Sequence, residues 1–456
     1  MFEDTITAIA TPLGEGGIAI IRISGENAVT IGDSIFQSRS GSKNHLANAK
    51  SHTIHYGYIH LNKKRLDEVM VSVMRAPATF TREDIIEINC HGGIQATKSV
   101  LDAALKSGAR LAVPGEFTKR AFLHGRIDLT QAEAVSDLIN ARTSMALSAA
   151  NEQLEGKLSQ RINQLRDDTM HVLAHVEAHI DFPDEDIKPD TMDGLIQRLE
   201  KAKSLIEKLM ATANDGQLIR RGIRVAIIGK PNAGKSSLLN QLLGHDRAIV
   251  SNVAGTTRDT ISEEAQIRGI LVVFIDTAGL QETDDQVEQE GVKRSLDSLN
   301  QADLVLYVLD SSEPLTADSE SSLADLSDRK HIVVLNKSDL PAVLDPKKIQ
   351  DSEIVSVSSI NGEGIESLKD AIQKSVWDGE ITSEMLEVMV NSRHQDALDR
   401  AKTSLEASIY QLQSGTELDL VSVDLRISTN AIGEIVGKTT TENLLDSIFS
   451  TFCIGK

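Results

Sequence analysis

Short apolar runs separated by glycine-containing turns dominate the first 125 residues of the chain. Four of these runs have the length and composition of β-strands, and one stretch near residues 93–107 has the periodicity of a helix. This mixture predicts a compact α+β domain over residues 1–125. The four predicted strands are Ile18–Ile23, Ile54–Ile59, Val69–Val73 and Ile85–Ile88.

Two later zones, about 128–215 and 380–448, have apolar residues at helical spacing. Pro183 divides the first zone into two helical stretches, because proline cannot continue a helix. Neither zone easily buries its apolar stripe alone, so we expect the two zones to pack together as one helical domain. The stripes are Leu154, Leu158, Ile162, Leu165, Val172, Val176 and Ile180; Leu195, Leu199, Ala202, Ile206 and Leu209; Leu398, Ala401, Leu405, Ser408 and Leu412; and Leu418, Val421, Leu425, Ile432 and Ile435.

Between the helical zones, apolar runs alternate with helical stretches from residue 222 to 375. This alternation is typical of an α/β domain with buried parallel strands. The chain is therefore predicted to be a multidomain α/β protein with segments 1–125, 126–218, 219–378 and 379–456. The predicted parallel strands are Val225–Ile228, Leu271–Ile275, Leu304–Leu309, His331–Leu335 and Ile354–Val357.

Composition narrows the possible partners. The formal net charge is −20, so the chain will not coat nucleic acid non-specifically, and any RNA contact needs a local basic patch or a basic partner. Cys90 and Cys453 form no CxxC pair or disulfide framework. The acidic start is not a secretory signal, and no stretch approaches the ~20 apolar residues of a membrane span. We therefore expect a cytoplasmic protein.

A phosphate-binding loop follows the first predicted strand of the α/β zone. Gly229–Ser236 reads Gly-Lys-Pro-Asn-Ala-Gly-Lys-Ser and leads into a predicted helix. Glycine lets backbone N–H groups converge on phosphate, Lys235 supplies a positive charge, and the Ser236 hydroxyl can bind Mg²⁺. The predicted phosphate-binding residues are Asn232, Ala233, Gly234, Lys235, Ser236 and Ser237.

Three further motifs end predicted strands in the order that GTP binding requires. Asp276 can hold Mg²⁺ through water, Gly279 can meet the γ-phosphate, and the Asp339 carboxylate can accept two hydrogen bonds from guanine that adenine cannot offer. A switch loop between the first two motifs should place Thr257 on Mg²⁺. The three motifs are Asp276, Thr277, Ala278 and Gly279; Asn336, Lys337 and Asp339; and Ser358, Ser359 and Ile360, while the switch loop contains Thr256 and Thr257.

The position after the Asp-x-x-Gly motif departs from Ras-like GTPases, in which a Gln there orients the attacking water. Here the residue is Leu280, so another group must orient the water. Glu288 is a candidate, and the alternative for Glu288 is a solvated carboxylate near the start of a helix.

Beyond the α/β zone, a set of motifs resembles the MnmE (TrmE) family of bacterial and organellar tRNA-modification GTPases. The resemblance covers nearly the whole chain. It implies a Ras-like P-loop GTPase domain inserted into a discontinuous helical domain, after an N-terminal folate-binding-like α+β domain. The motifs are Gly14–Gly25, Phe80–Glu87, His91–Gly93, Pro114–Phe122, Asp128–Ala134, Asp181–Glu185 and Phe452–Lys456.

The family's activity and partners follow as expectations. With the FAD-dependent partner MnmG (GidA), the family adds an aminomethyl- or carboxymethylaminomethyl-type group to C5 of the wobble uridine of certain tRNAs. A tetrahydrofolate such as 5-formyltetrahydrofolate supplies the one-carbon unit. The N-terminal domain is expected to form a homodimer and to bind folate through Arg22, Glu87, Arg126 and Lys456, with Arg126 standing where the family often has Lys.

The resemblance also implies how GTP is cleaved. K⁺ would be wrapped by Asn232, Ser251, Val253 and Thr256, within a nucleotide-binding loop Ser251-Asn252-Val253-Ala254-Gly255-Thr256. The expected catalytic residues are Lys235, Thr257 and the water-orienting Glu288, with hydrolysis stimulated by K⁺ when two G domains pair. The alternative is a regulatory or ribosome-assembly GTPase without one-carbon chemistry, although such a factor usually adds a basic RNA-binding module.

Overall fold

The computed structural model of the protein describes residues 4–41, 44–182, 192–244, 262–275, 301–349, 352–377 and 388–456. Contacts divide the chain into two compact units. Unit 1 contains residues 1–136, 153–203 and 400–456, and unit 2 contains residues 137–152 and 204–399. The protein therefore has the predicted multidomain α/β fold, whereas the predicted boundaries of its four segments remain predictions.

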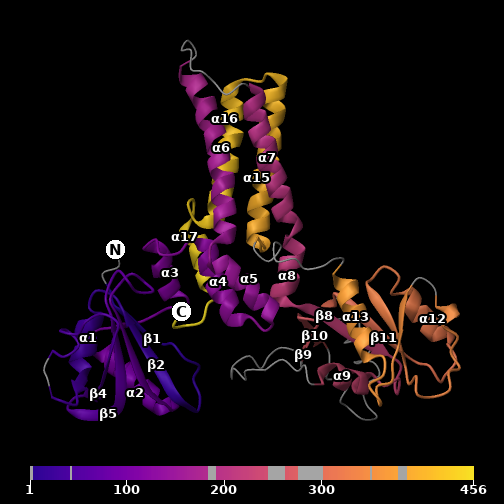
Figure 1. Cartoon of the computed structure of the whole chain (residues 1–456), viewed down its shortest axis with the longest axis horizontal. Helices are drawn as coiled ribbons and strands as arrows, with labels where there is room; N and C mark the ends of the chain where they lie inside the picture. Colours follow the sequence, from indigo (N-terminus) through magenta and orange to yellow (C-terminus); the bar gives the residue numbers. More distant parts are fainter. Residues whose placement is uncertain are drawn as a thin grey trace. The chain divides into compact units, whose positions relative to one another are not determined.

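The N-terminal part of unit 1 is a seven-stranded sheet in the order β3-β4-β5-β6-β2-β1-β7 (Figure 1). Neighbouring strands are antiparallel except for the parallel pair β1 and β7. All four strands predicted here are confirmed, as is the helix near 93–107. The elements are β1 (Ile6–Ile9), β2 (Gly16–Ser24), α1 (Ala28–Ile35), β3 (Phe36–Ser38), β4 (Thr53–Leu61), β5 (Lys64–Met74), β6 (Ile85–Gly92), α2 (Ile94–Lys106), β7 (Arg110–Leu111) and α3 (Glu116–Leu123).

Strand alternation gives this sheet one buried apolar face. Ile21 and Ile23 of β2 and Val71 of β5 are fully buried, and they pack with apolar residues of α1 and α2. Side chains one position along, such as Arg22, point to the other face of the sheet because successive side chains alternate. The core therefore lies between the sheet and these two helices.

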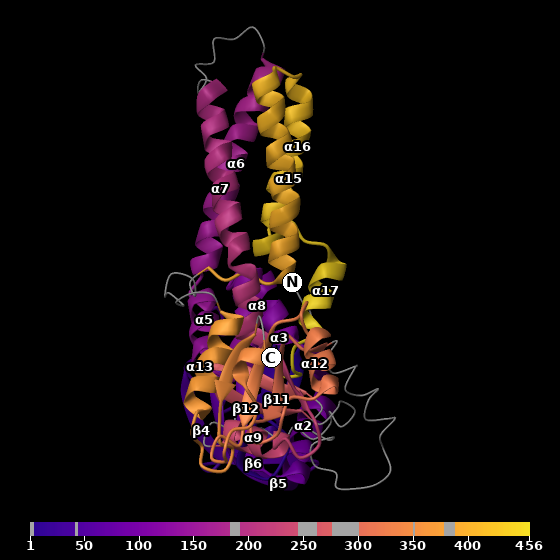
Figure 2. The same cartoon turned by 90° about the vertical axis from the view of Figure 1, so that its right-hand side faces the viewer.

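Helices from both sides of the inserted α/β domain pack together, as their apolar stripes predict. Helix α6 contacts α16, and the Arg426 guanidinium of α16 forms an ion pair with Glu177 of α6 at 2.7 Å (Figures 1 and 2). Lys203 of α7 pairs with Glu406 of α15 at 3.2 Å. The helices are α4 (Leu129–Asn140), α5 (Ser144–Leu154), α6 (Lys157–Asp181), α7 (Met192–Ala211), α8 (Ala213–Arg221), α15 (Ser392–Ser414), α16 (Leu418–Val436) and α17 (Glu442–Phe449).

The first predicted helical stripe does not belong to one helix. Helix α5 ends at Leu154, and Gly156, with φ of +86°, caps the start of α6 at Lys157. The stripe crosses this break without losing its spacing, which is why periodicity alone misses it.

Unit 2 contains a six-stranded sheet in the order β13-β12-β11-β8-β10-β9. The five predicted strands are confirmed and run parallel, but the edge strand β9 was not predicted and pairs antiparallel with β10. The elements are β8 (Ile223–Gly229), α9 (Lys235–Leu243), β9 (Glu263–Ile267), β10 (Ile270–Ile275), β11 (Leu304–Asp310), α12 (Ala317–Ala324), β12 (His331–Asn336), a 3₁₀ turn (Pro346–Lys348), β13 (Glu353–Ser356) and α13 (Ile365–Val376).

Helices cover both faces of this sheet. In β11, Leu304, Leu306 and Val308 pack toward α9 and α13, while Tyr307 and Leu309 belong to the cluster on the α12 side. A sheet buried on both faces explains why its strands read as continuous apolar runs. Among the described residues, no helix combines the length and hydrophobicity that crossing a membrane requires.

Candidate active site

The phosphate-binding loop connects β8 to α9, as predicted. Two of its glycines have no room for a side chain: a Cβ on Gly229 would lie 2.3 Å from the Val308 carbonyl oxygen, and one on Gly234 would lie 2.2 Å from Asn336 Nδ2. Asn232 and Gly234 have φ of +65° and +90°. The loop backbone is therefore fixed by its own conformation and by close packing on β11 and on the residue that ends β12.

Helix α9 begins at this loop without a side-chain cap on its first turn. The exposed Ser236 and Ser237 follow Lys235 in that turn. Uncapped N–H groups at a helix start form a favourable site for an anion. The Lys235 ammonium donates hydrogen bonds to the carbonyl oxygens of Gly229 (3.0 Å) and Lys230 (2.8 Å), and burial lowers its pKa.

Asn336 joins the phosphate-binding loop to the loop after β13. Its side chain is 1 % exposed, and its Nδ2 donates a hydrogen bond to the Ala233 carbonyl oxygen at 2.8 Å. Its Oδ1 accepts hydrogen bonds from the backbone N–H of Ser359 at 3.1 Å and from the Ser359 hydroxyl at 2.8 Å. One buried amide thus holds together two of the motifs that the sequence places far apart.

The remaining described residues of the predicted guanine site lie around this amide. Asp339 is exposed, and its Oδ1 accepts a hydrogen bond from the Ser358 hydroxyl at 2.5 Å. Gln241 of α9 donates to the Ser359 carbonyl oxygen at 3.0 Å, and Ile360 is 76 % exposed. These contacts place Asp339 at the same edge of the sheet as the phosphate-binding loop.

Asp310, the last residue of β11, contacts a predicted site residue but was not singled out from the sequence. Its carboxylate forms an ion pair with the Lys337 ammonium at 2.6 Å. Asp310 could have been found from the same signal as the other motifs, namely a polar residue at the end of a buried strand.

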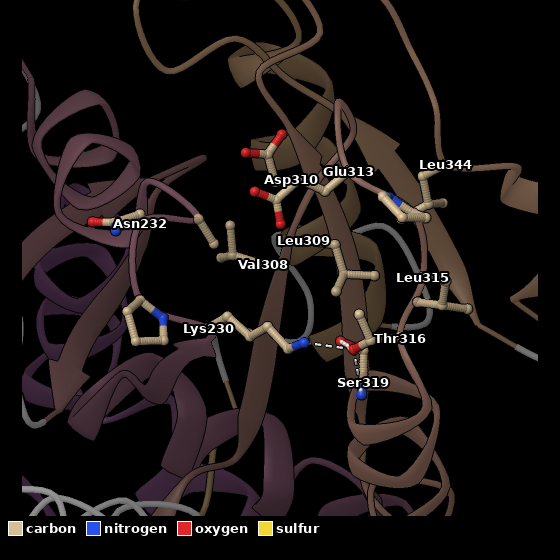
Figure 3. Close-up of a pocket in the computed structure, with 13 residues that line it drawn as sticks. Lys230, Asn232, Val308, Leu309, Asp310, Glu313, Leu315, Thr316, Ser319 and Leu344 are labelled. Atoms are coloured by element: carbon tan, nitrogen blue, oxygen red, sulfur yellow. Dashed lines mark hydrogen bonds between the residues drawn. The ribbon is translucent and has the colours of Figure 1, made fainter.

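Asp310 also lines a cavity of about 40 Å³ between the phosphate-binding loop and the segment before α12. Lys230, Asn232 and Thr316 line the same cavity (Figure 3).

Several predicted site residues lie outside the described part of the chain. They are the loop residues Ser251, Asn252, Val253, Ala254, Gly255, Thr256 and Thr257, the motif Asp276, Thr277, Ala278 and Gly279, and the candidate catalytic Glu288. Their roles remain predictions.

In unit 1, three of the four predicted folate contacts come together. Arg22 of β2 forms an ion pair with Glu87 of β6 at 2.8 Å, and its Nη1 donates to the Gly455 carbonyl oxygen at 3.4 Å. Burial and the nearby Arg22 guanidinium lower the pKa of Lys456, and Glu87 opposes that shift. The C-terminal tail therefore ends beside the β2–β6 strand pair.

The ring of Phe117, which the sequence analysis did not single out, lies 5.6 Å from the Arg22 guanidinium carbon. The backbone N–H of Phe117 also donates to the Lys456 carbonyl oxygen at 3.2 Å. Phe117 thus contacts both cationic residues of this group.

Arg126, the fourth predicted contact, has different partners. Its guanidinium carbon lies 4.7 Å from the centre of the Phe80 ring, and its Nη1 donates to the Phe80 carbonyl oxygen at 3.1 Å. Burial and the neighbouring Arg82 lower its pKa. Within the described residues, no hydrogen bond or ion pair joins Arg126 to Arg22, Glu87 or Lys456, so its place in a shared site remains a prediction.

Two family models match most of this chain. A family model described as the MnmE helical domain matches residues 129–453, and one described as the GTP-binding protein TrmE N-terminus matches residues 5–126. Among solved structures, the G domain of the FeoB iron transporter of T. maritima is 29 % identical and covers 34 % of this chain and 99 % of its own, with a TM-score of 0.27.

Full-length relatives are closer in sequence. The tRNA modification GTPase MnmE of Geobacillus kaustophilus (strain HTA426) is 48 % identical over 460 residues, which is 99 % of each chain. The protein of the same name from Clostridioides difficile (strain 630) is 47 % identical over 458 residues, covering 100 % of this chain and 99 % of the relative. The chain therefore belongs to the MnmE (TrmE) family of tRNA modification GTPases.

Proposed function

We propose that this protein hydrolyses GTP and, with the FAD-dependent partner MnmG (GidA), modifies C5 of the wobble uridine of certain tRNAs in the cytoplasm. The observation that carries the proposal is the Asn336 side chain, which links the phosphate-binding loop to the Ser358–Ser359 loop beside Asp339. This assembly supplies a phosphate site and a carboxylate at one sheet edge, as a guanine nucleotide requires.

Mg²⁺ fits the phosphate end of the site. Ser236 is an exposed residue in the first turn of α9, and hydroxyl oxygen suits this hard cation. Ser236 and Thr257 would hold the ion, which would supply positive charge to offset that of the phosphates. Lys235, at the start of the same helix, would provide the protein's own positive charge.

Replacing Asp339 by Asn tests the nucleotide assignment. The amide presents a donor where the carboxylate accepts, so Asp339→Asn should weaken GTP binding and admit xanthosine triphosphate. The measurement compares the Kd values of GTP, ATP and xanthosine triphosphate for the two proteins. Equal affinity of the unaltered protein for ATP and GTP, or an unchanged preference in the variant, would remove the basis of the proposal.

A tetrahydrofolate fits the group at the end of β2. Arg22 and Lys456 are cations with low exposure beside the Glu87 carboxylate, and a folate offers both an anionic glutamate tail and a polar pterin. Arg22, Glu87 and Lys456 would hold the ligand, with Arg126 as a further contact. When bound, the folate supplies the one-carbon unit for the modification.

A second copy of the chain fits the open face of the N-terminal sheet. Ile54 and Tyr56 of β4, Met70 of β5 and Ile18 of β2 are exposed large apolar residues, and Tyr56 and Met70 are paired in register. An exposed apolar patch of this kind marks an interaction surface. The patch shares its sheet face with Arg22 and Glu87, so a homodimer formed here would enclose the folate group.

A K⁺ ion and Glu288 would complete hydrolysis. Asn232, which holds φ of +65° in the phosphate-binding loop, would contribute an amide oxygen to K⁺ together with Ser251, Val253 and Thr256. Glu288 would orient the attacking water in place of a Gln, because Leu280 occupies the Gln position. The bound ion would neutralise charge between the phosphates when two G domains pair.

A further inference from the structure

Lys337 is held more firmly than an ordinary surface lysine. It lies one residue beyond β12 with φ of +62°, in the left-handed region that non-glycine residues rarely adopt. Its ammonium is 2.6 Å from Asp310 Oδ2, and the Lys337 and Asp310 side chains are only 31 % and 10 % exposed. The pair therefore has less solvent screening than an exposed ion pair.

The carboxylate that holds Lys337 is itself fixed on its other oxygen. Asp310 Oδ1 accepts hydrogen bonds from the backbone N–H of Ser312 at 2.9 Å and from the Ser312 hydroxyl at 2.6 Å. Burial raises the pKa of Asp310, but the bonds from Lys337 and Ser312 more than offset this, so the net pKa lies below its ordinary value. Asp310 is therefore charged and has one orientation.

The same turn also holds the backbone next to Lys337. The Ser311 hydroxyl donates to the Lys337 carbonyl oxygen at 3.1 Å, and the Ser311 N–H donates to the Asn336 carbonyl oxygen at 2.9 Å. Asp310 and Asn336 face each other in register across the parallel strands β11 and β12. The turn 310–312 thus fixes both the main chain and the ammonium of Lys337.

We propose that Asp310 is a positioning residue for guanine-nucleotide binding, because it anchors the ammonium of Lys337 so that the lysine stem forms a fixed apolar wall between Asn336 and Asp339. The inference rests on the proposed function, since Asn336 and Asp339 belong to the nucleotide site described above. A planar base needs apolar contact on its faces as well as hydrogen bonds at its edge, and a lysine stem provides that contact only when its head is anchored.

Asp310→Asn tests this role, because the amide keeps the shape and loses the charge. We expect the KM for GTP to rise about tenfold, the scale of one lost hydrogen bond between charged groups, with kcat changed less than about twofold. Asp303→Asn is the matched control. Asp303 directly precedes the same strand and pairs with Arg221 at 2.9 Å, away from the proposed site, so both constants should stay unchanged. Equal KM values for the two variants would overturn the inference, as would a fall in kcat matching the rise in KM.

A double-mutant cycle separates positioning from a general structural effect. Lys337→Met keeps an apolar stem and removes the ammonium, so adding Asp310→Asn to it should raise KM no further. Full additivity of the two changes would overturn the inference. Should Asp310→Asn fail to fold, Ser312→Ala removes one bond to the carboxylate and should raise KM about two- to threefold, again without changing kcat.

The base preference distinguishes this inference from the proposed function. Asp310→Asn should still prefer GTP over xanthosine triphosphate, because Asp339 is intact. If Asp339→Asn does not shift that preference, the proposed function fails. If Asp339→Asn shifts it and Asp310→Asn leaves KM unchanged, only the role of Asp310 fails.

Discussion

Arg120 is a fully buried cation in α3 that donates hydrogen bonds to three carboxylates. Its guanidinium donates to Asp4 Oδ1 at 2.7 Å, to Glu83 at 3.0 Å and to Glu116 at 3.0 Å. Removing Arg120 leaves the Glu83 and Glu116 side chains, which are only 10 % and 7 % exposed, with fewer compensating hydrogen bonds. Arg120→Met should therefore lower the free energy of opening around β1 and α3 by about 3–5 kcal/mol.

Hydrogen exchange of the β1 and α3 amides measures this loss. Arg65→Ala is the control, because the Arg65–Glu68 pair is exposed and should contribute at most about 1 kcal/mol. Similar losses in the two variants would show that the Arg120 network contributes no more than a surface pair.

The same network predicts a pH dependence. Burial raises the pKa values of Asp4 and Glu116, but hydrogen bonds from Arg110 and Arg120 outweigh burial and bring both pKa values below the ordinary 3.8 and 4.5. A lowered pKa in the folded state stabilises the fold above the unfolded pKa, and that contribution is lost as pH falls through the folded pKa. Protection of β1 and α3 should therefore decrease below about pH 4.5, and decrease less steeply in Arg120→Met. A flat profile in the unaltered protein down to about pH 3 would contradict this account.

The site residues at strand ends could be predicted from the sequence, whereas the residues that they bond to could not. Asn336, Asp339 and Ser358 could be assigned from their order along the chain, because parallel strands bring their carboxyl ends to one edge. The bond from Asn336 to Ala233 and the ion pair from Lys337 to Asp310 depend on strand register, which one sequence does not specify.

At the level of elements, long apolar runs identified the strands correctly and a short polar one was missed. Strand β9 reads Glu-Glu-Ala-Gln-Ile and buries only Ala265 and Ile267, so its alternation is too brief to stand out. It is an edge strand whose pairing comes from β10. Tertiary contact, and not local pattern, specifies such an element.

The C-terminal tail is an element without regular structure that reaches the proposed folate site. Gly455 has φ of +95°, and a Cβ there would lie 2.3 Å from the Ile9 carbonyl oxygen. Gly455→Ala should displace the tail, weaken 5-formyltetrahydrofolate binding by about tenfold through loss of the Lys456 contact, and leave GTP hydrolysis unchanged.

Isothermal titration with 5-formyltetrahydrofolate measures this effect. Gly108→Ala provides the control, since Gly108 also has a positive φ, of +109°, but no atom within 4 Å of a Cβ. Folate affinity that drops equally in both variants, or in neither, would argue against a role for the tail.

For the whole molecule, the sequence predicted a helical domain interrupted by an α/β domain, and the contacts of α6 with α16 agree. It did not predict that residues 137–152 group with unit 2. The reason is visible in one cluster: Ala149 of α5 is buried with Ile219, Trp377 and Met389, which all belong to unit 2. Helical periodicity reveals which face is buried but not which neighbour covers it.

Under the proposed pairing of two G domains, hydrolysis is a property of the dimer. A group that positions water contributes on the order of 10²–10⁴ in rate, so Glu288→Ala should slow single-turnover hydrolysis to that extent with little change in GTP affinity. Replacing K⁺ by Na⁺, whose smaller radius suits the proposed oxygen cage poorly, should slow the unaltered protein as well. Equal rates in KCl and NaCl would eliminate the cation's role, and a fully active Glu288→Ala would eliminate that of the glutamate.

We expect GTP cleavage on this chain to be needed for wobble-uridine modification, and nucleoside mass spectrometry of cellular tRNA can establish whether it is. Cells lacking the chain should lose the C5-modified uridine. The unaltered chain should restore it, while Asp339→Asn, expressed to the same level, should restore much less. Undiminished modified uridine in cells without the chain, or full restoration by Asp339→Asn despite lost GTP binding, would contradict the account.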